Sequence, residues 1–316
     1  MPTRVVLRLH CIVLATALAS RAGLSAAEPP IQERLARRIA PFHGEMGIAV
    51  KNLETGKAFA VHGDKRFPTA SLIKVAVMVE AYHQIAEGMF RPDTKVTLRE
   101  EDKAGDETVP LNVMHAGSIL SVADLLRFMI AWSDNTATNL LVRMVGTANV
   151  DRRLESYGIA EMKLFRPTFR DGKADAFPEL EREFGLGMTT PAAAVRLFEL
   201  IARGKVVSRA ACDEMISTLA LQQDRAMIPR SLPFERDSIL VANKTGWDEE
   251  KLPDASGFKG DVRSDAAYVK SPKARYVIAI CARRIKDKRA GADNEALVTG
   301  AALSRMVYDY FNPPAR

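Results

Sequence analysis

A serine and a lysine lie three positions apart in an otherwise apolar segment, residues 67–79 (FPTASLIKVAVMV). Residues at this spacing share one face of a helix, so the amine of Lys74 can approach the hydroxyl of Ser71. Apolar neighbours lower the pKa of an ammonium, which leaves some neutral amine to act as a base. Backbone N–H groups at a helix start favour a developing anion. The pair therefore fits a serine nucleophile, although lysines also extend from apolar helices to solvent.

Two further triplets follow in the sequence. Ser-Asp-Asn occupies residues 133–135 after Trp132, at an expected helix boundary, and Lys-Thr-Gly occupies residues 244–246 at the end of an expected strand. At average residue usage each fixed triplet arises by chance about once in several thousand positions. The ordered set on suitable elements is therefore a much stronger signal than the serine–lysine pair alone.

This ordered set is the signature of class A β-lactamases and penicillin-binding proteins. The chain resembles a class A β-lactamase-like serine hydrolase, and segments 115–126, 136–141 and 189–193 also look like segments of that family. The resemblance covers nearly all of the chain after residue 27. It implies an enzyme that opens β-lactam rings through a serine acyl-enzyme.

The resemblance implies a catalytic role for four residues. Ser71 would attack the lactam carbonyl, with Lys74 as base or proton relay. Ser133 would pass a proton to the leaving lactam nitrogen. The backbone N–H groups of Ser71 and Trp247 would form the oxyanion hole, although a tryptophan is bulky for that position.

The resemblance also implies a binding role for several residues. Asn135 would bind the amide of the substrate, and Lys244 with Thr245 would hold its carboxylate. Arg263 looks similar to an arginine that some family members place on the next strand to anchor the same carboxylate. An arginine at the surface end of a strand is an equally good interpretation.

One loop departs from the family pattern. The hydrolysing members carry a glutamate followed four residues later by an asparagine, which position the water that cleaves the acyl-enzyme. The corresponding loop, residues 166–183, contains no asparagine, and its candidate acids are Asp171, Asp175 and Glu179. Acylation is therefore better supported than deacylation. The alternatives are a peptidase acting on D-Ala-D-Ala ends of cell-wall peptides, and a penicillin-binding or sensor protein that does not hydrolyse the acyl-enzyme.

Hydrophobic periodicity predicts an α+β fold. It consists of a five-stranded antiparallel sheet flanked by helices, with an inserted all-helical subdomain. The sheet subdomain would comprise residues 28–68 and 222–316, and the helical subdomain residues 69–221. The strands are expected at residues 47–53, 57–61, 239–245, 265–270 and 276–283. The helices are expected at residues 31–39, 71–87, 125–132, 136–145, 192–201 and 294–311.

The N-terminus predicts export. Arg4 and Arg8 precede the short apolar stretch 11–19, which small residues follow, so residues 1–27 have the character of a signal peptide. Its removal takes away three arginines and no acid, so the formal net charge falls from +6 to +3. We expect a periplasmic or secreted protein without a membrane span after cleavage, and a monomer as the default.

The net charge and the spacing of histidines and cysteines leave a small molecule as the expected partner. The mild charge and a single basic run at residues 283–289, interpreted as a solvated loop, do not indicate nucleic-acid binding. The histidines and cysteines lack metal-ligand spacing, so we expect no metal and no cofactor. Cys212 and Cys281 are interpreted as buried free thiols, and whether they pair after export stays open.

Overall fold

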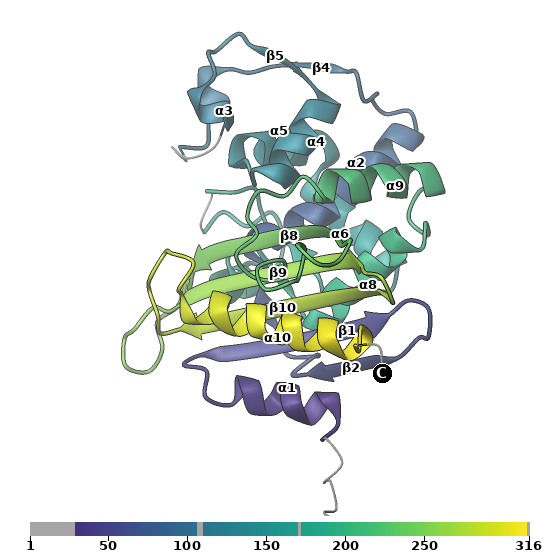
Figure 1. The fold of residues 1–316 in the computed structure, drawn as a ribbon. Coiled ribbons are helices and arrows are strands. Elements are labelled where there is room, and N and C mark those ends of the chain that lie inside the picture. Colours follow the sequence, from purple (N-terminus) through teal and green to yellow (C-terminus); the bar gives the residue numbers. More distant parts are fainter. Residues whose placement is uncertain (1–28, 106–109, 170–171, 315–316) are drawn as a thin grey trace, which may run out of the picture.

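A five-stranded antiparallel sheet in the order β2-β1-β10-β9-β8 joins the two ends of the chain. This computed structural model describes residues 29–105, 110–169 and 172–314, so the predicted signal peptide and Asp171 lie outside the described residues. The strands are β1 (Glu45–Asn52), β2 (Ala58–Val61), β8 (Leu240–Glu249), β9 (Asp261–Lys270) and β10 (Arg275–Ile285). Figure 1 shows α10 (Glu295–Phe311) lying across one face of this sheet.

The sheet is buried on both faces. Successive apolar side chains of β10 point alternately into two cores, one on each face. Ile278 and Ile280 pack into the core beneath α10 and α1 (Ile31–Ile39). Val277 and Ala279 join the larger core of the helical part of the molecule, where α8 (Pro191–Ala202) lies against the sheet. This arrangement explains why residues 276–282 of β10 form a continuous apolar run.

The chain between β2 and β8 is mainly helical. Its helices are α2 (Lys74–Ala86), α3 (Pro110–Val113), α4 (Val122–Ala131), α5 (Asn135–Val145), α6 (Thr147–Ser156), α7 (Pro178–Phe184), α8 and α9 (Arg209–Leu219). Side chains cap two of these helices: Ser121 accepts a hydrogen bond from the backbone N–H of Asp124 at 3.1 Å, and Thr190 accepts one from that of Ala193 at 3.1 Å. Side-chain caps of this kind satisfy N–H groups that have no partner within the helix.

Short strands also occur in this segment, which the predicted fold describes as all-helical. They are β3 (Phe67–Pro68), β4 (Lys95–Thr97), β5 (Ile119–Ser121), β6 (Lys163–Leu164) and β7 (Gly187–Thr189). They form a β4-β5 pair and a β3-β7-β6 sheet. Strands of two or three residues are too short to show the alternation by which a strand is predicted from sequence. The predicted subdomain boundaries stay a prediction.

The basic run at residues 283–289 was predicted to be a solvated loop, and its first residue does not fit this prediction. Arg283 lies inside β10 and is buried. Its guanidinium donates to Glu250 at 2.9 Å and to Glu183 at 3.1 Å. The prediction was wrong for this residue because a basic side chain in a strand is buried when carboxylates from other segments reach it.

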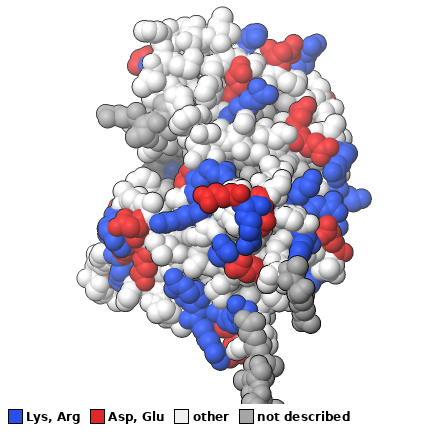
Figure 2. Space-filling model, in the orientation of Figure 1, with Lys and Arg blue, Asp and Glu red and all other residues white. Residues whose placement is uncertain are grey.

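The surface carries both signs of charge. Figure 2 shows lysine and arginine side chains interspersed with aspartate and glutamate over the face that α10 crosses, without a continuous basic surface there. Across the part of the chain that the structure describes, no helix has the length and apolarity needed to cross a bilayer.

The β8-β9 hairpin is fastened to the 3-10 turn η1 (Ala70–Ile73), which precedes α2. The Oγ of Ser264 donates to the carbonyl oxygen of Thr69 at 2.8 Å. A Cβ atom at Gly246 would lie 2.5 Å from that same carbonyl oxygen and 2.5 Å from the Oγ of Ser264. Only a glycine allows β8 to approach the turn this closely.

We therefore expect Gly246→Ala to lower the free energy of unfolding by about 2 kcal/mol, because the added methyl group must displace backbone. Urea denaturation measures this change. Gly291→Ala is the matched control: Gly291 is exposed, and its new Cβ would meet the movable Oδ1 of Asp293 at 3.0 Å. Its expected effect is below about 0.5 kcal/mol. Equal effects of the two substitutions would contradict the close approach at Gly246.

Candidate active site

Ser71 lies at the edge of a cavity between the helical part of the molecule and the β8 edge of the sheet. It is the second residue of η1 and is partly exposed. The cavity has a volume of about 160 Å³, and Asn135, Thr168 and Trp247 also line it. Residues from four separate segments of the chain therefore share one space with the predicted nucleophile.

Lys74 connects α2 to the turn between α4 and α5. Its side chain is fully buried. Its Nζ donates to the carbonyl oxygen of Ser133 at 2.6 Å, to the Oδ1 of Asn135 at 2.7 Å and to the Oγ of Ser133 at 3.2 Å. The structure thus brings three of the predicted site residues into direct contact.

The turn that carries Ser133 is strained and firmly held. Ser133 has a φ of 58°, which is unusual for a residue with a side chain. The carboxylate of Asp134 is buried and caps α5: it accepts from the backbone N–H of Ala137 at 2.8 Å and from that of Leu111 at 2.8 Å. Desolvation raises the pKa of Asp134, and the two backbone hydrogen bonds oppose the rise. These bonds fix the direction in which Ser133 points.

Lys244 approaches the same hydroxyl from β8. It is fully buried, and its Nζ donates to the Oγ of Ser133 at 3.0 Å and to the carbonyl oxygen of Thr245 at 2.8 Å. Desolvation lowers the pKa of Lys244 to about 7, against an opposing effect of the carboxylates of Asp224 and Asp265. The hydroxyl of Ser133 therefore accepts from two amines and keeps its own proton free to donate.

A buried acid behind β8 was not predicted from the sequence. Asp265 is fully buried and accepts from the side-chain amide of Asn243 at 2.9 Å and from the backbone N–H of Ile228 at 2.9 Å. Burial raises its pKa to about 8. An aspartate directly before the apolar residues 266–269 of an expected strand was the available signal.

Arg263 and Trp247 face each other across the β8-β9 pair. The guanidinium carbon lies 4.5 Å from the centroid of the indole ring, which is a cation–π contact. Arg263 is only 5% exposed, so the alternative of a surface arginine was wrong. Desolvation lowers its pKa, and Asp261 opposes this shift. Both side chains, together with Thr245, line a second cavity of about 220 Å³.

The loop that departs from the family pattern presents Thr168 to the cavity of Ser71. The backbone N–H of Thr168 donates to the Oδ1 of Asn139 at 2.8 Å, and its hydroxyl donates to the same atom at 2.9 Å. A buried ion pair of Arg166 with Glu181, at 2.7 Å, holds the loop from inside. Neither contact was predicted from the sequence, because each depends on how the loop folds back on itself or on α5.

The candidate acids of this loop that the structure describes do not line the cavity. Asp175 is exposed and accepts from the hydroxyl of Thr147 at 2.7 Å. The side chain of Glu179 is 81% exposed and lies 3.6 Å from Arg182. The described residues that line the cavity include one carboxylate, that of Asp248 on β8, which pairs with Lys251 at 3.2 Å.

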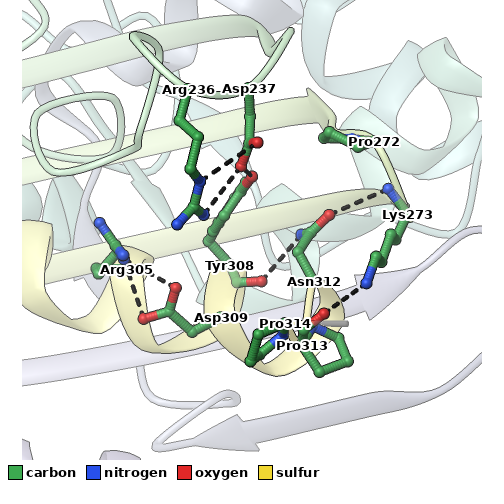
Figure 3. A pocket seen from close by; sticks show the side chains of 10 residues that line it. All are labelled: Arg236, Asp237, Pro272, Lys273, Arg305, Tyr308, Asp309, Asn312, Pro313 and Pro314. Atoms are coloured by element: carbon green, nitrogen blue, oxygen red, sulfur yellow. Dashed lines mark hydrogen bonds and ion pairs between the residues drawn. The ribbon is translucent and has the colours of Figure 1, made fainter. Parts of the chain in front are cut away.

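A larger cavity, of about 570 Å³, lies beside the C-terminal end of α10 and shares no described residue with the cavity of Ser71. Figure 3 shows Arg305 paired with Asp309, at 2.9 Å, and Tyr308 donating to Asp237, while Lys273 donates to the carbonyl oxygen of Pro313. Among the described residues no group of three histidine, cysteine or acidic side chains is placed to hold a metal ion. The two described cysteines, Cys212 and Cys281, are buried free thiols, and burial raises the pKa of each.

The residues around Ser71 define a class of site. A serine at the start of a helix, a second serine hydroxyl between two buried amines, and a glycine that brings a strand edge close to the nucleophile together suit acyl transfer to serine. The sheet order and the helical segment between its strands provide the scaffold.

The chain belongs to the Beta-lactamase enzyme family, whose sequence model matches residues 30–311. It is 30% identical to Beta-lactamase L2 of Stenotrophomonas maltophilia over 213 residues, which cover 64% of this chain and 66% of that protein. It is 23% identical to Beta-lactamase CARB-3 of Pseudomonas aeruginosa over 86% of each chain. An ancestral class A β-lactamase has a similar structure, with a TM-score of 0.74, 25% identity, and coverage of 89% of this chain and 100% of that one. The predicted family and fold class are confirmed.

The lowered pKa of Lys244 predicts a pH dependence of anion binding. The amine is a cation below about pH 7 and loses its charge above it, so binding of a carboxylate-bearing β-lactam should weaken about tenfold per pH unit above that value. Calorimetric titration between pH 6 and 9 with the Ser71→Ala variant, which excludes acylation, measures this. Lys244→Arg in the same background stays charged and should flatten the profile. Parallel profiles for the two proteins would contradict the assignment.

Proposed function

We propose that this protein is a serine hydrolase that opens β-lactam rings by acylating Ser71. One observation carries the proposal: the Oγ of Ser133 lies 3.2 Å from the Nζ of Lys74 and 3.0 Å from that of Lys244, beside the cavity that Ser71 enters. Such a hydroxyl can relay a proton between a base and a leaving nitrogen.

The reaction begins with attack of the Oγ of Ser71 on the lactam carbonyl carbon, while its proton passes towards Lys74. The backbone N–H groups of Ser71 and Trp247 stabilise the oxyanion, and each such donor contributes about 3 kcal/mol to the lowering of the barrier. The carbon–nitrogen bond then breaks. Ser133 gives its proton to the departing nitrogen and regains one from an adjacent ammonium. The product is an ester of Ser71.

The remaining residues hold the substrate. Lys244, Thr245 and Arg263 bind its carboxylate. Both cations are buried, and Thr245 and Arg263 line the second cavity, which shares Trp247 with the cavity of Ser71. Asn135 binds the amide of the side chain, because its own side chain lines the cavity and is oriented by Lys74 at 2.7 Å. The protein is exported by its N-terminal signal peptide and acts as a monomer.

Hydrolysis of the ester is the slow step in this proposal. Thr168 lines the cavity from the loop in which hydrolysing relatives carry a glutamate, and a threonine hydroxyl is too weak a base to activate water at neutral pH. The acyl-enzyme therefore accumulates before it is hydrolysed.

Ser71→Ala should abolish the release of colour from a chromogenic cephalosporin and the mass increase of the protein. For the unaltered protein we expect a burst of about one equivalent followed by slower turnover, measured by absorbance and intact-protein mass spectrometry. Release of D-alanine from a pentapeptide instead would identify a cell-wall peptidase, and an adduct that persists without turnover would identify a penicillin-binding or sensor protein. Adduct formation by the Ser71→Ala variant would refute the assignment of the nucleophile.

Thr168→Glu should raise the deacylation rate at least tenfold, because it places a carboxylate at the wall of the cavity where water must approach the ester. The rate is measured by following the loss of the adduct mass after excess substrate is removed. Thr168→Gln is the matched control: it has the same size and no basic oxygen, so it should leave the rate within about threefold of the original. An equal acceleration by both substitutions would show that space, and not a base, limits hydrolysis.

A further inference from the structure

A groove near the start of β8, away from the site residues, is lined mostly by basic side chains. It has a volume of about 440 Å³ and is formed by the end of β9, the starts of β8 and β10, and the segment from α8 to α9. Leu240 of β8 lines it, whereas Thr245 of the same strand lines the second cavity of the active site, about 16 Å further along. The groove shares no described residue with either cavity of that site. The charged residues of this basic groove are Arg203, Lys205, Arg209, Asp213, Lys270 and Arg275.

Two arginines from the segment between α8 and α9 are held in place beside the groove. The Nε of Arg203 donates to Glu199 at 2.9 Å. The Nε of Arg209 pairs with Asp213 at 3.2 Å. The side chain of Arg209 also lies against Gly204, where a Cβ atom would come within 2.7 Å of its Cδ. A guanidinium has five N–H donors, so each arginine keeps donors for a ligand after its Nε is paired.

The hydroxyl of Tyr268 adds a neutral donor to the groove. Tyr268 is partly buried in β9 and lines the groove. Desolvation raises its pKa, and the positive charges of Arg275 and Arg209 oppose the rise, so guanidiniums from two segments lie near this hydroxyl. The Nε of Arg275 donates to Glu54 at 2.9 Å, which orients this guanidinium as well. The phenol stays protonated at neutral pH and can therefore donate to an anion.

Two lysines of the groove lack an acidic partner. In the part of the chain that the structure describes, no carboxylate lies within ion-pair distance of the Nζ of Lys205 or of Lys270, and both residues are exposed. The five cations of the groove are accompanied by one lining carboxylate, that of Asp213, which already pairs with Arg209. Like charges gathered at one place repel one another, and an anion that binds between them removes this repulsion.

We propose that the basic groove binds a small anion that carries two phosphate groups. Each phosphate group brings about 1.5 to 2 negative charges at neutral pH and three acceptor oxygens, so two of them match the excess of cations in the groove. Guanidiniums bind phosphate oxygens in pairs, and the two free lysines act as point charges. The inference is independent of the proposed function, because the groove shares no described residue with the cavity of Ser71.

Calorimetric titration of the protein with inorganic diphosphate tests this proposal, and inorganic phosphate is the comparison. We expect diphosphate to bind at least tenfold more tightly, because it engages cations from several segments at once. Lys205→Gln combined with Lys270→Gln should weaken the binding of diphosphate at least tenfold, since it removes both unpaired cations.

Lys95→Gln combined with Lys259→Gln is the matched control. Both lysines are exposed and lie outside the groove, and their replacement lowers the net charge by the same amount. This control should change the affinity less than about threefold, because distant exposed charges are screened by salt. Thermal unfolding shows whether each variant is folded. If the folded protein does not bind diphosphate at millimolar concentration, or if both pairs of substitutions weaken binding equally, the proposal is overturned.

Sedimentation with vesicles distinguishes a free phosphate compound from a lipid headgroup. The vesicles contain phosphatidylglycerol and phosphatidylcholine, with phosphatidylcholine alone as the reference. Binding of diphosphate without sedimentation of the protein supports the small anion. Sedimentation that is lost in the Lys205→Gln and Lys270→Gln variant, in a protein that does not bind free diphosphate, overturns it and assigns the groove to a lipid surface.

Discussion

The approach of two buried lysine side chains to one serine hydroxyl is the interaction on which the rest of the site depends. Two amines that both carry a charge repel each other, and burial removes the water that would screen them. The Oγ of Ser133 lies within hydrogen-bonding distance of both Lys74 and Lys244, and carbonyl oxygens of the chain accept from each amine as well. Burial lowers the pKa of Lys244 to about 7, so a shared proton becomes mobile at neutral pH.

This arrangement requires three segments to be held in register. α2 supplies Lys74, the α4–α5 turn supplies Ser133, and β8 supplies Lys244. The close approach of β8 to η1 at Gly246 fixes the distance between the strand edge and the nucleophile, and the capping carboxylate of Asp134 fixes the turn. Apolar packing alone could not set these positions to within a few tenths of an ångström, whereas directional hydrogen bonds and a missing Cβ atom can.

The sequence predicts which segments carry the site residues better than it predicts the contacts that hold those segments in place. The capping serine and threonine, the strands at both chain ends and the three motifs are local signals, and the structure places helices and strands where they predict them. The ion pair of Arg166 with Glu181 depends on how one loop folds. The bonds of Thr168 to Asn139 and the burial of Arg263 depend on which separate segments meet, and no local pattern encodes either. Asp265 lies between these cases, because its place at the start of an expected strand is visible in the sequence and its contact with Asn243 is not.

Three of the six described residues other than glycine with a positive φ lie at or beside the site residues, and the other three, His62, Phe177 and Arg284, do not line the cavity of Ser71. Among the described residues other than glycine with a positive φ, Ala70 precedes the nucleophile, Ser133 contacts both lysines, and Phe169 borders the cavity. Each such conformation is unfavourable by about 1–3 kcal/mol and persists only where the surroundings fix it. The two cores on either side of the sheet supply the stability that offsets it. At Ser133 the capping carboxylate of Asp134 fixes the strained turn, so the surrounding hydrogen bonds set the position of this hydroxyl between the two lysines.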